Sequence, residues 1–139
     1  MSRARLLVLA AAFAALAGCG DTLKGTEYAE ATVAKFREQM KAKQFEQIYD
    51  ATGAEFKDAT SRENGIALFA AVDRKLGGFK RAQRINWSVN TNNMVTMAVL
   101  VYDSEYADGT ATETFTVKVD DGQGEIVGYN IQSLQMLIK

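Results

Sequence analysis

The stretch that decides the fold is "MAVLVYDSEYADGTATETFTVKV", Met97–Val119. Apolar and polar side chains alternate along both of its halves, and this period of two is typical of β-strands with one buried face. The Asp108-Gly109 pair between the halves is a strong signal for a two-residue hairpin turn. The stretch therefore predicts two long antiparallel strands joined by a tight turn.

That turn sets the register of the predicted hairpin. With the Asp-Gly pair in the loop, Tyr102 lies opposite Phe115 and Leu100 lies opposite Val117. Large apolar side chains then share one face, and a slip by one residue would divide them between both faces. The opposite face keeps an apolar stripe, formed by Met97, Val99 and Val101.

Two further strands flank this hairpin and complete a four-stranded antiparallel meander. Before it, Ile85, Trp87 and Val89 alternate with polar residues, which predicts a strand that buries these three side chains. The asparagine-rich "NTNN" at residues 90–93 forms the turn that follows. After the hairpin and a glycine-containing turn, a last strand is predicted with a buried face of Val127, Tyr129 and Ile131.

Upstream of the strands, the apolar period becomes that of a helix. From Thr26 onward, one helical face carries Ala29, Val33, Phe36 and Met40. A second short helix is predicted around residues 45–49, and a third opens at the capping box "TSRE", residues 60–63, and ends at the glycine pair 77–78. About three N-terminal helices followed by strands predict an α+β domain, with the helices packed on a curved four-stranded antiparallel sheet.

The only cysteine of the chain follows an apolar segment near the N-terminus. Residues 1–5 carry two arginines and the next twelve residues carry no charge, as in an export signal. As a helix, that apolar run extends only about 18 Å, too short for the roughly 30 Å hydrocarbon layer of a membrane. The residues "LAGC" at 16–19 resemble the lipobox of bacterial lipoproteins. This resemblance implies cleavage after Gly18 and a diacylglycerol thioether, with further acylation, on Cys19.

These features divide the chain into a signal peptide at 1–18, a lipid-bearing flexible tether at 19–25 and an α+β domain at 26–139. Resemblance to sorted lipoproteins implies retention in the inner membrane when aspartate directly follows the cysteine, but here that position is Gly20. We therefore expect an anchor in the outer membrane, with the domain facing the periplasm. The alternative is an ordinary buried free cysteine, since cysteine is among the most buried residue types.

Composition excludes several classes of function. The chain has no histidine, and its cysteine is assigned to lipid, so the usual zinc and copper ligands, cysteine nucleophiles and histidine acid–base catalysis are not expected. Loss of the leader leaves 14 basic and 17 acidic residues, a net charge of −3 that does not favour nucleic acid. The acidic "DDGQGE" at 120–125 lacks the ligand spacing of a calcium loop. No metal or cofactor is expected.

The order of the elements, with "KQFEQIYDATGAEF" at residues 43–56 and "LGGF" at 76–79, resembles the nuclear transport factor 2-like (cystatin-like) superfamily, in particular small bacterial envelope members of unassigned function. The resemblance spans roughly residues 27–133 and implies a cone-shaped space between sheet and helices. Four aromatic side chains are candidates to line a pocket there for a lipidic or aromatic ligand: Trp87, Tyr102, Phe115 and Tyr129. The other interpretation is that they fill the cone as packed core.

Two surface features suggest partners. The apolar stripe on the second face of the hairpin favours a homodimer, although strand propensity alone also accounts for its valines. Basic residues after the third helix suit either contact with anionic lipid or a solvated rim: Arg74, Lys75, Lys80, Arg81 and Arg84.

The isomerase chemistry known in the superfamily requires an aspartate base and a tyrosine. The chain offers Asp50 with Tyr49, Tyr102 and Tyr129, but no spacing selects them. We therefore expect a membrane-anchored, non-catalytic binding or interaction module. Its partners are the membrane through Cys19, a second copy, and an unidentified envelope protein or small ligand. The alternative is a small-molecule or lipid carrier, or an isomerase-like enzyme, that uses the cone pocket.

Overall fold

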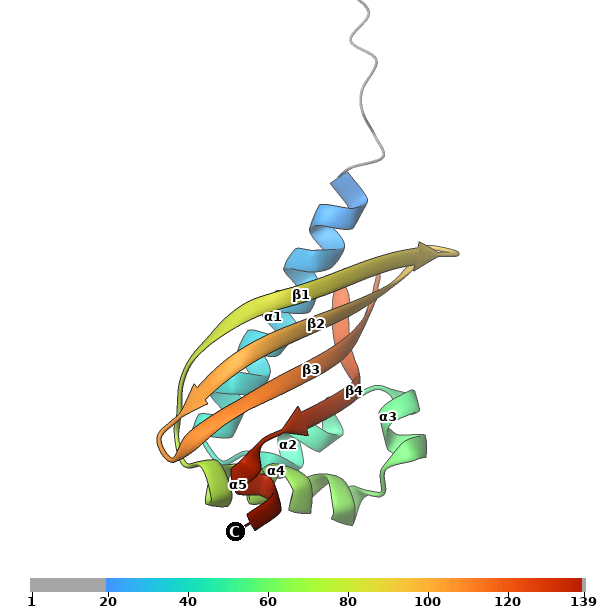
Figure 1. The fold of residues 1–139 in the computed structure, drawn as a ribbon. Helices are drawn as coiled ribbons and strands as arrows, with labels where there is room; N and C mark the ends of the chain where they lie inside the picture. The colour runs from blue at the N-terminus through green and yellow to red at the C-terminus, as the bar shows by residue number, and fades with distance from the viewer. Residues whose placement is uncertain (1–19, 139) are drawn as a thin grey trace, which may run out of the picture.

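The computed structural model describes residues 20–138, so the predicted leader and Cys19 lie outside the described residues. Helices come first in the chain and a four-stranded sheet follows, which confirms the predicted α+β class (Figure 1). The elements are α1 (Gly20–Lys41), α2 (Phe45–Asp50), α3 (Ala54–Ala59), α4 (Arg62–Leu76), β1 (Phe79–Asn92), β2 (Val95–Tyr106), β3 (Gly109–Asp120), β4 (Gln123–Gln132) and α5 (Leu134–Ile138).

The sheet is an antiparallel meander in the order β1-β2-β3-β4, as predicted. Helix α1 contacts all four strands from one side, which we call the inner face. The opposite side, the outer face, points toward the viewer in Figure 1. The described helices lie behind the sheet or along its margins, so the middle of the outer face carries no helix.

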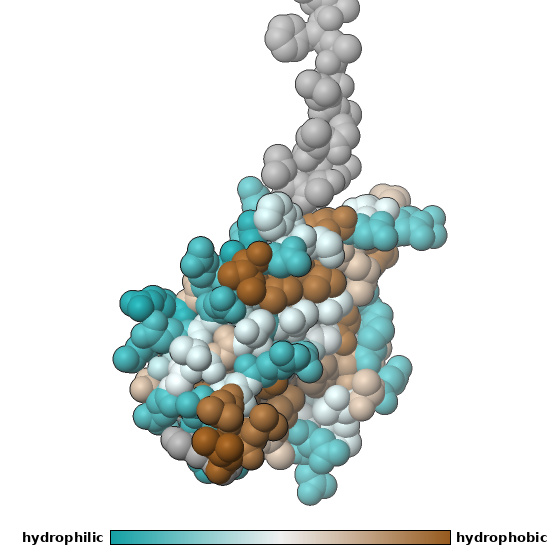
Figure 2. All heavy atoms as spheres, viewed as in Figure 1, coloured by the Kyte–Doolittle hydropathy of each residue, from teal (hydrophilic) through white to brown (hydrophobic). Residues whose placement is uncertain are grey.

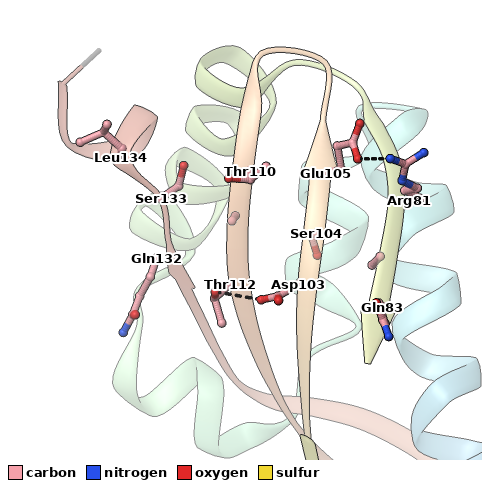
Figure 3. A pocket seen from close by; sticks show the side chains of 12 residues that line it. Arg81, Gln83, Asp103, Ser104, Glu105, Thr110, Thr112, Gln132, Ser133 and Leu134 are labelled. Atoms are coloured by element: carbon pink, nitrogen blue, oxygen red, sulfur yellow. Dashed lines mark hydrogen bonds and ion pairs between the residues drawn. The ribbon is translucent and has the colours of Figure 1, made fainter. Parts of the chain in front are cut away.

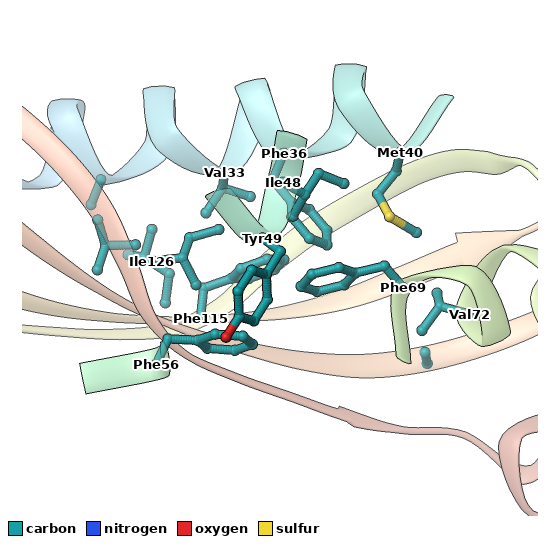
Figure 4. Close-up of a cluster of buried hydrophobic side chains, with 14 of the residues drawn as sticks. Val33, Phe36, Met40, Ile48, Tyr49, Phe56, Phe69, Val72, Phe115 and Ile126 are labelled. Atoms are coloured by element: carbon teal, nitrogen blue, oxygen red, sulfur yellow. The ribbon is translucent and has the colours of Figure 1, made fainter. Parts of the chain in front are cut away.

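The core lies between α1, α4 and the inner face of the sheet (Figure 4). The predicted stripe on α1 is buried, from Ala29 at 0% exposure to Met40 at 7%. Phe36 is its centre, because its ring centroid lies 5.7 Å from that of Phe69 and 5.1 Å from that of Phe115. The helical period of three and four therefore located this face correctly.

The β2–β3 hairpin has the predicted faces but a different register. Leu100 pairs with Phe115, and Tyr106 pairs with Gly109, so the loop residues are Ala107 and Asp108. The predicted partners were displaced by two residues, and an even displacement leaves every side chain on its own face. The predicted turn at Asp108-Gly109 is therefore wrong by one position.

The end of α4 explains this displacement. The N–H of Ala107 donates to the carbonyl of Gly78 at 2.8 Å, and the N–H of Asp108 donates to the carbonyl of Leu76 at 2.9 Å. The loop is thus docked on the segment that leaves α4, and this contact selects the turn residues. A long-range hydrogen bond of this kind leaves no signal in the hairpin's own sequence.

The other two hairpins carry the positive φ angles that type I′ turns need. Asn93 and Met94 have φ values of 50° and 67°, and Asp121 and Gly122 have values of 49° and 70°. The predicted turn at residues 90–93 therefore moves to Asn93–Met94, because β1 continues to Asn92. The glycine-containing turn before the last strand is confirmed at Asp121–Gly122.

Helix α1 begins at Gly20 rather than at Thr26, so the described part of the segment predicted as a flexible tether is helical. The buried Gly25 lies within this part of the helix. A Cβ atom at this position would lie only 2.8 Å from Cγ2 of Thr96, so the glycine allows the helix to run close against β2. The helix therefore packs on the sheet before the start of its apolar stripe.

The sequence also missed two short helices, α3 and α5. Thr60, predicted as the capping residue of the third helix, instead follows the end of α3. The N-cap of α4 is Ser61, whose Oγ accepts a hydrogen bond from the N–H of Asn64 at 3.2 Å. The predicted end of this helix at Gly77 is confirmed, with φ at 75°.

Candidate functional site

The cone between the sheet and the helices is filled by aromatic rings. Of the four predicted pocket residues, Phe115 is fully buried, and its ring centroid lies 5.9 Å from that of Tyr102 and 5.1 Å from that of Tyr129. Phe36 closes the group from α1, at 5.3 Å from the Tyr129 ring. These contacts match the packed-core interpretation for three of the four residues.

Trp87, the fourth predicted pocket residue, lies apart from this group. It pairs with Leu100 and so belongs to the inner face, yet 56% of its surface is exposed. A register shift between Arg84 and Asn86 marks a bulge in the edge strand β1, which leaves Ile85 50% exposed as well. The prediction that β1 buries Ile85 and Trp87 is therefore wrong.

A cluster of buried polar side chains lies beside the aromatic core, at the junction of α1 with β2 and β3. The guanidinium Nη1 of Arg37 lies 2.6 Å from Oε1 of Glu113, and both residues are buried. Arg37 also donates to the hydroxyls of Tyr106 and Ser104, each at 3.2 Å. Glu113 further accepts hydrogen bonds from the hydroxyls of Tyr106 at 2.9 Å and Tyr129 at 2.5 Å.

Burial fixes the protonation of the two tyrosines. It raises the pKa of the Tyr106 and Tyr129 hydroxyls well above the usual value, and the negative charge of Glu113 raises both further. Both hydroxyls therefore stay protonated and donate to the carboxylate. The cationic group of Arg37 also lies 4.2 Å from the ring centroid of Phe79. Throughout the described part of the chain, each buried side-chain nitrogen and oxygen has a hydrogen-bond partner.

The residues considered for isomerase chemistry do not form one site. Asp50 is exposed at the end of α2, where it forms an ion pair with Arg62. The Tyr49 hydroxyl donates to the carbonyl of Thr60 at 2.7 Å. Tyr129 donates to Glu113 on the far side of the aromatic core, so its hydroxyl is already engaged.

A groove of about 590 Å³ crosses one end of the outer face, between the start of α5 and the paired strands β1, β2 and β3 (Figure 3). Its walls combine polar and apolar surface, and most of the residues that line it are polar. The side chains that project into it come from all four strands and from the first residues after β4: Arg81, Gln83, Asp103, Glu105, Thr110, Thr112, Gln132, Ser133 and Leu134.

The charges of the groove are partly paired within it. Arg81 forms an ion pair with Glu105 across the β1–β2 ladder at 2.6 Å. The Thr112 hydroxyl donates to the exposed carboxylate of Asp103 at 3.2 Å. Asp103 therefore keeps accepting positions that face solvent, and Leu134, 63% exposed, adds an apolar rim. Such walls suit a polar ligand or a protein segment that brings a donor to Asp103.

The predicted apolar stripe lies on the same outer face as the groove. Met97, 36% exposed, and the half-buried Val99 and Val101 continue along β2 from Asp103. Figure 2 shows apolar atoms gathered over this face and a second apolar group at the C-terminal helix. The structure thus places the stripe opposite the core, as the alternation predicted.

Lys118 borders the stripe but is not a free cation. Its Nζ lies 2.8 Å from Oε1 of Glu55 on α3, and this hydrogen bond lowers the pKa of the Glu55 carboxyl. Lys118 is the cross-strand partner of Met97. Its positive charge is therefore neutralised by Glu55, which lies at the margin of the sheet.

Three of the five residues in the predicted basic cluster are engaged in intramolecular contacts. Arg81 pairs with Glu105, Arg84 pairs with Glu30 of α1, and Lys75 donates to the carbonyl of Met136. Most of the cluster lies where α4 leads into β1, at the end of the molecule away from the start of α1 (Figure 1).

Within residues 20–138, no group of three histidine, cysteine, aspartate or glutamate side chains is arranged to hold a metal ion. In the same range, no helix combines the length and apolar character needed to cross a bilayer.

Comparison of the chain with models of known protein families, with curated proteins and with solved structures gives no match.

Proposed function

We propose that this protein is a lipoprotein of the bacterial envelope, anchored in the outer membrane by the lipid on Cys19, whose domain binds a partner in the periplasm without catalysis. The carrying observation is the outer face of the sheet, which combines the groove with the apolar stripe and has no helix over its middle. Exposed apolar surface next to a polar depression is typical of interaction sites.

The interior supports binding over catalysis. An acid or base that acts on a substrate must reach it, and its pKa is usually tuned by an unmatched environment. Here Glu113 accepts from an arginine and two tyrosines, and the cone beside it is filled by rings. The polar groups of the inner face are therefore already engaged in hydrogen bonds within the domain, and the rings leave no space for a substrate beside them.

A relation to the nuclear transport factor 2-like superfamily is part of the same proposal. It rests on the order of helices and strands and on the α1 helix packed in a meander sheet. Members of that superfamily include non-catalytic binders, which agrees with a filled cone. Fold likeness alone does not assign a function, so the outer face carries the argument.

Lipidation of Cys19 is tested by the intact mass of the full chain expressed in a Gram-negative host. The expected product begins at residue 19, carries a mass increment for a diacylglyceryl thioether and an N-acyl chain, and fractionates with membranes. A Cys19→Ser chain is the control and is expected to lose the increment and the membrane fraction. A free thiol on Cys19, or a product that keeps residues 1–18, would contradict the proposal.

We infer that a second copy of the chain is one partner of the outer face. The Val101→Asp substitution is expected to weaken self-association at least tenfold, because a carboxylate in an apolar interface loses its hydration without gaining a partner. Sedimentation velocity of the leaderless Cys19→Ser domain measures this. Ala34→Asp, on the exposed side of α1, is the matched control. A wild-type domain that stays monomeric at high micromolar concentration would rule out the dimer.

A further inference from the structure

The β1–β2 turn presents an unusual residue to solvent. Met94 is 90% exposed and has a φ of 67°, in a two-residue turn whose other member is Asn93. Turns with positive φ at both positions strongly favour asparagine, aspartate and glycine. A methionine there is both strained and exposed, so the fold gains nothing from it. Backbone strain that the fold does not require, at a residue other than glycine or asparagine, points to a role outside the fold.

This turn lies at the same end of the molecule as the start of α1. Gly25 of α1 packs directly beside Thr96 of β2. From that contact, the helix runs back to Gly20 over about 7.5 Å at 1.5 Å per residue, and the strand runs back to Met94 over about 7 Å at 3.4 Å per residue. Figure 1 shows both segments leading to the same end. The start of α1 and the β1–β2 turn therefore extend a similar distance beyond the Gly25–Thr96 contact.

The start of α1 also replaces the predicted flexible tether between the anchor and the domain with a helix. Because α1 begins at Gly20, only the peptide bond to Cys19 separates the lipidated residue from the helix. A seven-residue flexible tether would have let the domain tumble freely over the membrane. A helical connection instead holds the end of the domain that bears Met94 close to the lipid surface.

The charges at this end favour apolar contact over electrostatic attraction. The residues that flank Met94 in the strands and the turn are neutral, namely Asn90, Thr91, Asn92 and Asn93. Val119 pairs with Thr96, so Asp120 at the end of β3 and Asp121 in the β3–β4 turn lie at the same end of the sheet as Met94. On α1, Lys24 and Glu27 lie on either side of Gly25, so acidic side chains still outnumber basic ones at this level and do not attract anionic headgroups. The matching surface is therefore a zwitterionic phospholipid interface.

We propose that Met94 inserts into the phospholipid interface beside the anchor, so that the lipid on Cys19 and the β1–β2 turn together hold the domain in one orientation. This inference rests on the lipidation proposed above. In this orientation, the groove lies toward the opposite end of the sheet, away from the membrane and open to a periplasmic partner.

The test uses a unique thiol. When Cys19 carries lipid, Met94→Cys is the only free cysteine, and it is labelled with an environment-sensitive fluorophore in the lipidated protein on phosphatidylcholine vesicles. We expect strong quenching by lipids with a shallow spin label, unchanged between low and high salt. The control is Ala107→Cys in the β2–β3 loop, at the other end of the sheet, which is expected to remain unquenched.

The outcomes separate this inference from the proposed function. Vesicle-bound protein whose label at position 94 is quenched no more than the label at position 107 would overturn the inference and leave lipidation standing. A chain that does not associate with vesicles at all would overturn both. A quenching signal that disappears at high salt would also contradict the inference, since it would indicate electrostatic contact.

A second variant and a measurement on the unsubstituted protein test the inference without a fluorophore. Met94→Gly is expected to make the domain more resistant to urea, because glycine adopts the left-handed turn without strain.

In unsubstituted protein, oxidation of Met94 by dilute peroxide is expected to slow several-fold on vesicles, relative to the unlipidated Cys19→Ser chain. Equal oxidation rates in the two preparations would count against insertion.

Discussion

The Glu113→Ala substitution is expected to lower the free energy of unfolding by about 3–5 kcal/mol. The substitution leaves the buried guanidinium of Arg37 without its counter-charge, and Tyr106 and Tyr129 lose the acceptor for their hydroxyls. An unpaired buried charge loses hydration that nothing in the core replaces. The effect is large because all three partners depend on the same carboxylate.

Urea unfolding followed by circular dichroism measures this loss. Glu38→Ala is the matched control, because Glu38 neighbours Arg37 on α1 and its side chain is 75% exposed, and a surface change of this kind costs about 0.5 kcal/mol or less. Glu113→Gln keeps the acceptor oxygen but not the charge and is expected to fall between the two. If Glu113→Ala cost no more than Glu38→Ala, the ion pair would not be part of what stabilises the core.

The sequence carried a signal for this cluster that our prediction did not use. Glu113 falls on the buried face in the alternation of its strand, two residues before Phe115. Arg37 lies four residues after Val33, which places it along the predicted apolar stripe of the first helix. Two opposite charges at inward positions predict a buried pair, because neither is tolerated there alone. What the sequence does not give is their mutual distance.

The fold was predictable where local periodicity decided it. Alternation assigned the faces of β2 and β3, and an error of two residues in register did no harm to that assignment. Prediction failed where a distant backbone group decided the outcome. The β2–β3 loop is selected by the carbonyls of Leu76 and Gly78, which accept from its two N–H groups.

The outer face was predictable only in part. Its apolar stripe followed from alternation alone, since Val99 and Val101 alternate with buried residues. The groove did not, because it forms where Arg81 of β1 and Thr110 of β3 meet the first turn of α5, a helix too short to show a period. The bulge at Ile85 likewise leaves Ile85 and Trp87 exposed on a strand that was predicted to bury them, and no proline or glycine marks it.

The Phe36→Ala substitution is expected to cost about 3–5 kcal/mol of unfolding free energy, as measured by urea unfolding. Phe36 is 2% exposed, and its ring contacts Phe69, Phe115 and Tyr129. Its removal empties the centre of the cone, and surrounding groups relax only partly into the space. Phe36→Leu fills most of that volume and is expected to cost clearly less.

The same variant tests whether the cone is closed in the native protein. An apolar cavity left by a phenyl ring stays dry and binds benzene, so benzene is expected to raise the midpoint of Phe36→Ala unfolding and to leave that of the wild type unchanged. A wild-type domain that benzene stabilises equally would mean that Phe36 does not fill the cone. The small-ligand carrier would then regain support over a partner bound on the outer face, because the inner face would offer a site as well.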